Sequence, residues 1–108
     1  MLDLTEFLGD TIVNREVSYK GKTKTFRFRE LTADEAEGIF LSVDADPKKN
    51  KGLRNRIVSK VVVDADGNQA FKEADVGKLP NELANELQKI ALEVNGIGDK
   101  AEQEAKNA

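Results

Sequence analysis

The sequence contains no cysteine and no histidine. Without cysteine there can be no disulfide framework, no thiolate nucleophile and no redox pair. Without histidine there can be no Ser-His-Asp triad and no histidine acid–base catalysis, and structural zinc loses both of its usual ligands. The remaining carboxylates, lysines and single tyrosine would need a deep pocket to shift their pKa values, which a short, charged chain rarely builds. We therefore expect a protein that is not an enzyme and that holds no metal and no cofactor.

Long apolar runs are also missing, since none approaches the roughly 20 residues that a membrane span needs. The N-terminus carries early acids and lacks the basic start of a secretory signal. We therefore expect a cytoplasmic protein that does not contact a membrane. The net charge of -3 and the pI of about 5.1 argue against a nucleic-acid binder.

The 108 residues, 39% hydrophobic and 34% charged, fit one globular domain. We expect the domain to cover residues 1–97. Residues 98–108 are polar, carry no large apolar side chain and are predicted to form a flexible tail. At the other end, Leu4, Phe7 and Leu8 have helical spacing before Gly9, which predicts a short helix over residues 2–8.

Residues 12–29 have the pattern of a β-hairpin, and the one turn signal within them is Lys20-Gly21. A two-residue loop there pairs Tyr19 with Lys22. Because side chains alternate between the faces of a strand, this register gathers the large apolar residues on one face: Val13, Val17, Tyr19, Phe26 and Phe28. An isolated hairpin is marginally stable, so we expect this face to pack against helices.

The residues after the hairpin predict three main helices. Thr32 and Glu35 have the spacing of a capping box before an apolar stripe of Ala36, Ile39, Phe40 and Val43. Asp46 can cap a further short segment that starts at Pro47, although residues 48–52 could equally be loop. A second stripe comprises Leu53, Ile57, Val58, Val61 and Val62, but the β-branched residues 61–63 could instead form a strand.

The last helix is predicted to open at Pro80 and Asn81 and to end at Asn95-Gly96, a glycine C-cap. Its buried stripe comprises Leu83, Leu87, Ile90 and Val94, with Ala84 and Ala91 beside them. The expected fold class is therefore α+β: an N-terminal β-hairpin packed against a small bundle of about three to four helices, with a disordered polar C-terminal tail.

Two sets of residues are candidates for contact with a partner or a second copy. The first is a basic run with no acid between its members: Lys48, Lys49, Lys51, Arg54, Arg56 and Lys60. Six of the 17 cations lie there, which leaves 11 against 20 acids elsewhere, so the run could dock phosphate or an acidic partner, or form a solvated face. The second candidate is Leu92, which lies about half a turn from the buried stripe and is expected to face outward.

Residues 64–68 contain alternating acids, Asp64 and Asp66, followed by Gly67. A calcium-binding EF-hand loop needs glycine at its sixth position and glutamate at its twelfth. Counted from Asp64, those positions hold Gln69 and Asp75, so the match fails. A tight turn, with aspartate side chains bonding the local backbone and Gly67 at positive φ, is the favoured interpretation.

The order of these features resembles the tail assembly chaperones of long-tailed (siphovirus-type) bacteriophages. The resemblance spans about residues 15–97 and runs from the hairpin through a capped helix and a charged helix. It then continues through the Asp-Gly turn with Phe71, the pair Asp75-Val76 with Leu79, and a last helix that ends in Asn95-Gly96.

The resemblance implies that the protein binds the tape measure protein, keeps it soluble during tail assembly and is absent from the finished virion. It also implies a homo-oligomer and a longer form made by ribosomal frameshifting. Ala105-Lys106-Asn107 can be encoded as GCA-AAA-AAC, which contains a slippery heptamer, so an overlapping reading frame is predicted there. Two alternatives stay open: a nucleic-acid-associated or regulatory module that uses residues 48–60, and a structural component of the phage tail or neck.

Overall fold

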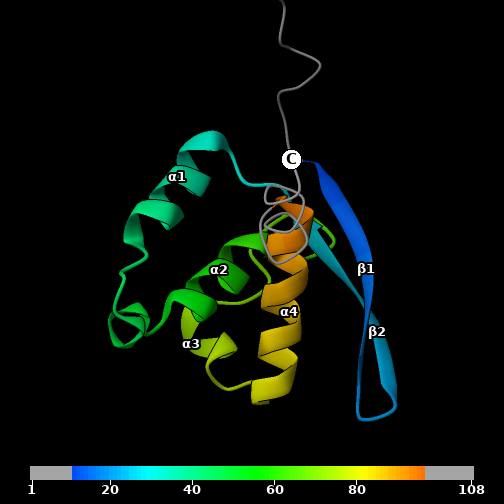
Figure 1. The fold of residues 1–108 in the computed structure, drawn as a ribbon. Helices are drawn as coiled ribbons and strands as arrows, with labels where there is room; N and C mark the ends of the chain where they lie inside the picture. Colours follow the sequence, from blue (N-terminus) through cyan, green and yellow to red (C-terminus); the bar gives the residue numbers. More distant parts are fainter. Residues whose placement is uncertain (1–10, 97–108) are drawn as a thin grey trace, which may run out of the picture.

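The computed structural model of the chain describes residues 11–96 and has the expected α+β fold. A three-stranded antiparallel sheet, in the order β1-β2-β3, is combined with helices that lie beside it (Figure 1). The predictions of a helix over residues 2–8 and of a polar tail over residues 98–108 lie outside the described residues.

The hairpin forms as predicted. Strands β1 (Ile12–Tyr19) and β2 (Lys22–Arg29) pair in the expected register, from Tyr19 opposite Lys22 to Ile12 opposite Arg29. At the turn, Lys20 has φ 50° and Gly21 has φ 79°. Two successive left-handed residues match the twist of the strands, which is why a two-residue loop suffices there.

Both hypotheses for residues 53–63 are partly right. Helix α2 (Leu53–Val61) ends one residue earlier than its apolar stripe predicts, and Val62 takes an extended backbone. Strand β3 (Val62–Val63) then pairs with β2, placing Val62 opposite Phe28 and Val63 opposite Arg27. The β-branched side chains that disfavour a longer helix suit this short strand, which is buried at both residues.

The turn predicted over residues 64–68 follows directly. The Asp64 carboxylate accepts the N–H groups of Asp66 and Asn68 at 2.9 and 3.0 Å, and Gly67 has φ 82°. Helix α3 (Glu73–Val76) comes next and buries Val76 in the core.

Helix α4 (Asn81–Val94) covers the apolar face of the hairpin and packs against α2 (Figure 1). Its predicted stripe is confirmed in its central part, because Leu87, Ile90 and the two alanines are buried while Leu83 and Val94 are half-buried. The helix is followed by Gly96 at φ 71°, the predicted glycine cap. The largest fully buried side chains of the core are Phe28, Leu87, Val58, Val61, Val62 and Val76.

Helix α1 (Ala33–Ser42) begins with the predicted capping box, in which Thr32 and Glu35 each accept the other's backbone N–H. Of its apolar stripe, only Ile39 is buried, while Phe40 and Val43 are exposed. The 3-10 helix η2 (Pro47–Asn50) follows, capped by the side chain of Asp46 as predicted. In Figure 1, α1 and η2 lie on the side of the helices away from the hairpin.

Candidate protein-binding surfaces

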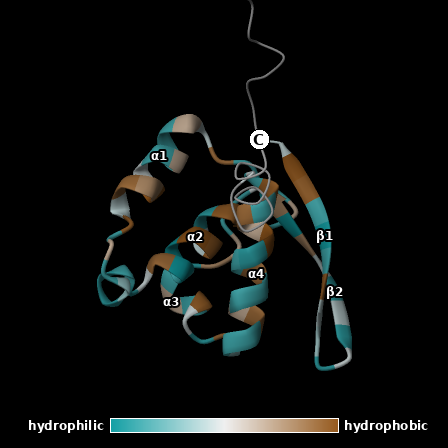
Figure 2. Ribbon diagram, in the orientation of Figure 1, coloured by the Kyte–Doolittle hydropathy of each residue, from teal (hydrophilic) through white to brown (hydrophobic). Residues whose placement is uncertain are grey.

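The largest exposed apolar side chains of the described residues gather at the C-terminal end of α1. Phe40 is 56% exposed, Leu41 79% and Val43 50%, and we call these three residues the α1 patch. In Figure 2 α1 shows brown segments between teal and white ones and lies away from the sheet. An exposed cluster of this kind is a typical sign of a surface that meets a partner.

The sequence contains a signal for this exposure besides the helical stripe. Ile39, Phe40, Leu41 and Val43 are four large apolar residues within five positions. On a helix of 3.6 residues per turn they spread over a wide arc, so one flat contact with the core cannot cover all four. The structure buries Ile39 and leaves the other three in solvent.

Acidic side chains precede and follow the α1 patch along the chain. Glu37 lies one turn before Leu41, Asp34 lies in the first turn of the helix, and Asp44 follows its end. All three are exposed. The surface therefore combines apolar contact area with negative charge, which favours a partner segment that is apolar and basic.

Helix α1 is attached to the rest of the molecule mainly through Arg29, at the end of β2. The Arg29 guanidinium donates two hydrogen bonds to the Glu35 carboxylate, at 2.9 and 2.7 Å, and a third to the backbone oxygen of Lys60 at 2.7 Å. The two bonds from Arg29, followed by the bond from the backbone N–H of Thr32, lower the pKa of Glu35 from 4.5 to about 2. The paired carboxylate thus serves as an anchor for α1.

The side chain of Asn95 makes a second connection at the C-terminal end of α4. Its oxygen accepts the backbone N–H of Leu31 at 2.7 Å, and its amide group donates to the oxygens of Ala91 and Arg29. This asparagine therefore does more than end the helix, because it also fixes the start of the linker to α1.

The predicted basic run does not form one continuous free surface. Arg54 is half-buried and donates to the side-chain oxygens of Asn81 and Asn85, at 2.8 and 3.0 Å, so it joins α2 to α4. Arg56, also half-buried, lies 4.0 Å from a carboxylate oxygen of Glu73. The other members of the run are exposed in η2, the residue after it and the end of α2: Lys48, Lys49, Lys51 and Lys60.

Leu92 is half-buried and packs against the hydrophobic core. The expectation that its side chain faces outward is therefore corrected, because α4 is covered on more of its circumference than a single stripe. A role for Leu92 in self-association stays a prediction, but the α1 patch offers far more exposed apolar surface.

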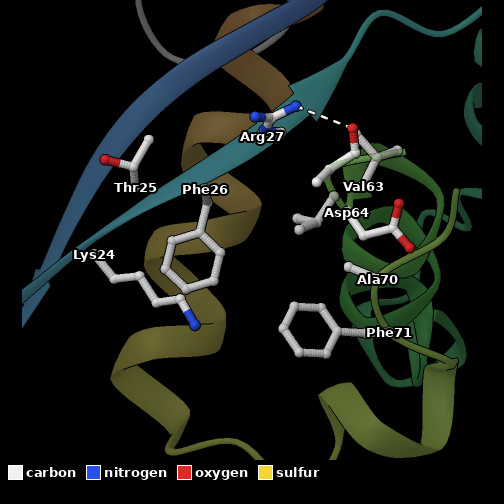
Figure 3. Close-up of a pocket in the computed structure, with 10 residues that line it drawn as sticks. Lys24, Thr25, Phe26, Arg27, Val63, Asp64, Ala70 and Phe71 are labelled. Atoms are coloured by element: carbon white, nitrogen blue, oxygen red, sulfur yellow. Dashed lines mark hydrogen bonds between the residues drawn. The ribbon is translucent and has the colours of Figure 1, made fainter. Parts of the chain in front are cut away.

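A second candidate surface lies beside β2. A pocket of about 330 Å³ is lined by two parts of the chain: residues 24–27 of β2, and residues 62–65 with Ala70 and Phe71. Figure 3 shows the rings of Phe26 and Phe71 on opposite sides of the pocket, with Lys24 reaching along its edge. Arg27 closes one end by donating to the backbone oxygen of Ala65 at 3.2 Å.

The volume of this pocket lies at the lower end of the roughly 300–1,000 Å³ typical of ligand sites. It contains no pair of groups suited to nucleophilic or acid–base chemistry, since Asp64 is the one acid along it and its carboxylate caps the adjoining turn. Within residues 11–96 there is also no group of three or more acids that could hold a metal ion. The pocket is suited to an inserted apolar side chain.

Comparisons of the chain with models of protein families, with curated proteins and with solved structures gave no match. Over the part of the chain that the structure describes, no helix has the length and apolar character required to cross a bilayer.

Proposed function

We propose that the protein is a tail assembly chaperone of a long-tailed bacteriophage, which binds the tape measure protein in the host cytoplasm and keeps it soluble during tail assembly. The proposal rests on the order of motifs along the chain and on one structural observation, the α1 patch. A protein that keeps another chain soluble needs exposed apolar contact area together with surface charge.

The charge is evident in the composition, with 34% charged residues, whereas the contact area is not visible until the fold places Phe40, Leu41 and Val43 in solvent. The acids around this patch would select basic, apolar segments of the tape measure protein and would keep the chaperone itself soluble. Helix α1 also stands apart from the sheet, so it can accept a partner without disturbing the core (Figure 1).

The basic run supports the nucleic-acid hypothesis less than the sequence alone suggested. Arg54 and Arg56 are directed to partners within the fold, which leaves the exposed lysines as the free cations of that run. No aromatic side chain lies among them to stack on bases.

Co-expression with a fragment of the tape measure protein that is insoluble by itself tests the proposal. We expect the fragment to become soluble and to co-purify with the chaperone as a complex whose molar mass is measured by light scattering. A fragment that stays insoluble, beside a chaperone that stays monomeric, would contradict the proposal.

A further inference from the structure

Strand β2 has an open backbone edge beside the pocket. The N–H of Glu30 donates to the oxygen of Thr11 at 3.0 Å, so the N–H of Glu30 points toward β1. Because this direction alternates along an antiparallel ladder, Thr25 and Thr23 direct their N–H and C=O groups away from β1. Among the described residues, β3 pairs with β2 at Arg27 and Phe28 and reaches no further toward the hairpin turn.

The turn over residues 64–68 is the reason that β3 is so short. A third residue of β3 would be Asp64, opposite Phe26. Instead, the N–H of Asp64 donates to the oxygen of Asn68 at 2.8 Å, and the chain turns away from the sheet. The edge of β2 from Phe26 to Lys22 is thus left without a paired strand within residues 11–96.

The pocket lies where the next strand would place its side chains. A segment that continued the line of β3 would run antiparallel to β2, with its successive residues opposite Phe26, Thr25, Lys24, Thr23 and Lys22. Directly opposite residues share a face of the sheet. The residue opposite Phe26 would therefore point to the side of the sheet where the Phe26 and Phe71 rings flank the pocket (Figure 3).

The charge along this edge selects the other side chains of such a segment. Lys24 and Lys22 lie on the same face as Phe26, and β2 contains no acid. Acidic side chains opposite these two lysines would form cross-strand ion pairs, whereas basic ones would be repelled. The same lysines would also repel a second β2 strand, as edge lysines commonly do in natural sheets.

We propose that this edge binds an extended acidic segment of a partner protein by strand addition. The segment has the pattern apolar-x-acidic-x-acidic, where the apolar side chain enters the pocket between Phe26 and Phe71. Its backbone bonds the free groups of Thr25 and Thr23, and its acids pair with Lys24 and Lys22. This is the β-augmentation mode of peptide recognition, in which the backbone supplies affinity and the pocket supplies specificity.

The site is separate from the α1 patch in both position and chemistry, so it does not depend on the proposed chaperone function. One surface favours a basic apolar partner, and the other favours an acidic extended one. A failure of either proposal would leave the other standing.

Binding of a short peptide to the full chain tests the inference. The probe is fluorescein-labelled Ser-Phe-Thr-Glu-Thr-Glu-Thr-Gly, and its twin carries lysine in place of both glutamates. Fluorescence anisotropy at low ionic strength should show saturable binding of the acidic peptide and about tenfold weaker binding of the basic twin. Amide hydrogen exchange at Thr23 and Thr25 should slow on addition of the acidic peptide.

Two pairs of variants separate strand addition from simple attraction between charges. Thr25→Pro removes an N–H that points to the open edge and should weaken binding about tenfold, while Asn14→Pro makes the same change on the outer edge of β1 and should leave binding unchanged. Lys24→Glu should likewise weaken binding about tenfold, while Lys49→Glu in η2 should not. Circular dichroism verifies that each variant is folded.

Equal binding of the acidic and basic peptides, or unchanged binding by both Thr25→Pro and Lys24→Glu, would overturn the proposal. A single-stranded oligonucleotide of equal charge serves as the competing polyanion. If it displaces the peptide and its own binding is indifferent to Thr25→Pro, the edge recognises negative charge in general, and the proposal is also overturned.

Discussion

Arg29 connects three segments that are distant from one another along the chain. It lies at the end of β2, holds the Glu35 carboxylate of α1 and donates to the last turn of α2 through the oxygen of Lys60. A bidentate arginine–carboxylate pair is among the stronger charge-assisted interactions, and this one is only partly exposed. It therefore acts together with the apolar packing of Ile39, the one buried residue of the helix, in holding α1 in position.

The depressed pKa of Glu35 makes this connection sensitive to pH. A carboxylate whose pKa falls from 4.5 to about 2 on folding stabilises the folded state above pH 4.5, and this stability is lost as the pH falls toward 2. Glu35→Gln should lower the free energy of unfolding by about 1–2 kcal/mol at neutral pH. Its difference from the wild type should shrink between pH 4.5 and pH 2.

Urea titrations at a series of pH values measure this difference. The matched control is Glu37→Gln on the exposed side of the same helix, which should change stability by less than about 0.5 kcal/mol. A gap between Glu35→Gln and the wild type that stays constant down to pH 2 would show that the ion pair is not its source.

At the scale of elements, α1 contains a glycine that its position does not require. Gly38 lies in the helix interior, and an added Cβ atom would have no neighbour within 4 Å. Alanine favours a helix over glycine by about 0.5–1 kcal/mol. Gly38→Ala should therefore slow hydrogen exchange of the α1 amides by about two- to fivefold, with little effect on α4. Equal slowing in α1 and α4 would mean that the helix opens only with the whole molecule, and unchanged exchange in both would contradict the expected gain in stability.

The elements that the sequence predicts well are those whose signals are local. The Lys20-Gly21 turn sets the hairpin register, and the Thr32–Glu35 capping box sets the start of α1, without help from distant residues. The amphipathic stripe of α4 predicts which residues of that helix are buried, because the helix has one broad buried face. Gly67 likewise marks its turn through its own backbone preference.

The features that escape prediction depend on how elements meet. The helical stripe in α1 does not tell which of its residues are buried, because this depends on how much surface the rest of the fold places against the helix. Arg54 belongs to a charged run in the sequence and becomes a link between α2 and α4 only when Asn81 and Asn85 lie beside it. The open edge of β2 also depends on where β3 stops, which residues 61–63 alone do not determine.

The whole molecule presents two surfaces of opposite chemistry. Acids flank the α1 patch, on the side of the helices away from the hairpin, while β2 carries four cations and no acid: Lys22, Lys24, Arg27 and Arg29. A protein that binds one chain through α1 could thus recruit a second through the hairpin. The net charge of -3 conceals this separation.

If the α1 patch holds the tape measure protein, as we propose, a charge placed on this patch should abolish the effect on solubility. Leu41→Asp should leave the fold intact, because that side chain is 79% exposed, but should return a co-expressed tape measure fragment to the insoluble fraction. Ile12→Asp is the matched control, since Ile12 is a large exposed apolar residue on the sheet, and it should keep the fragment soluble. A folded Leu41→Asp variant that solubilises the fragment as well as the wild type does would contradict the claim.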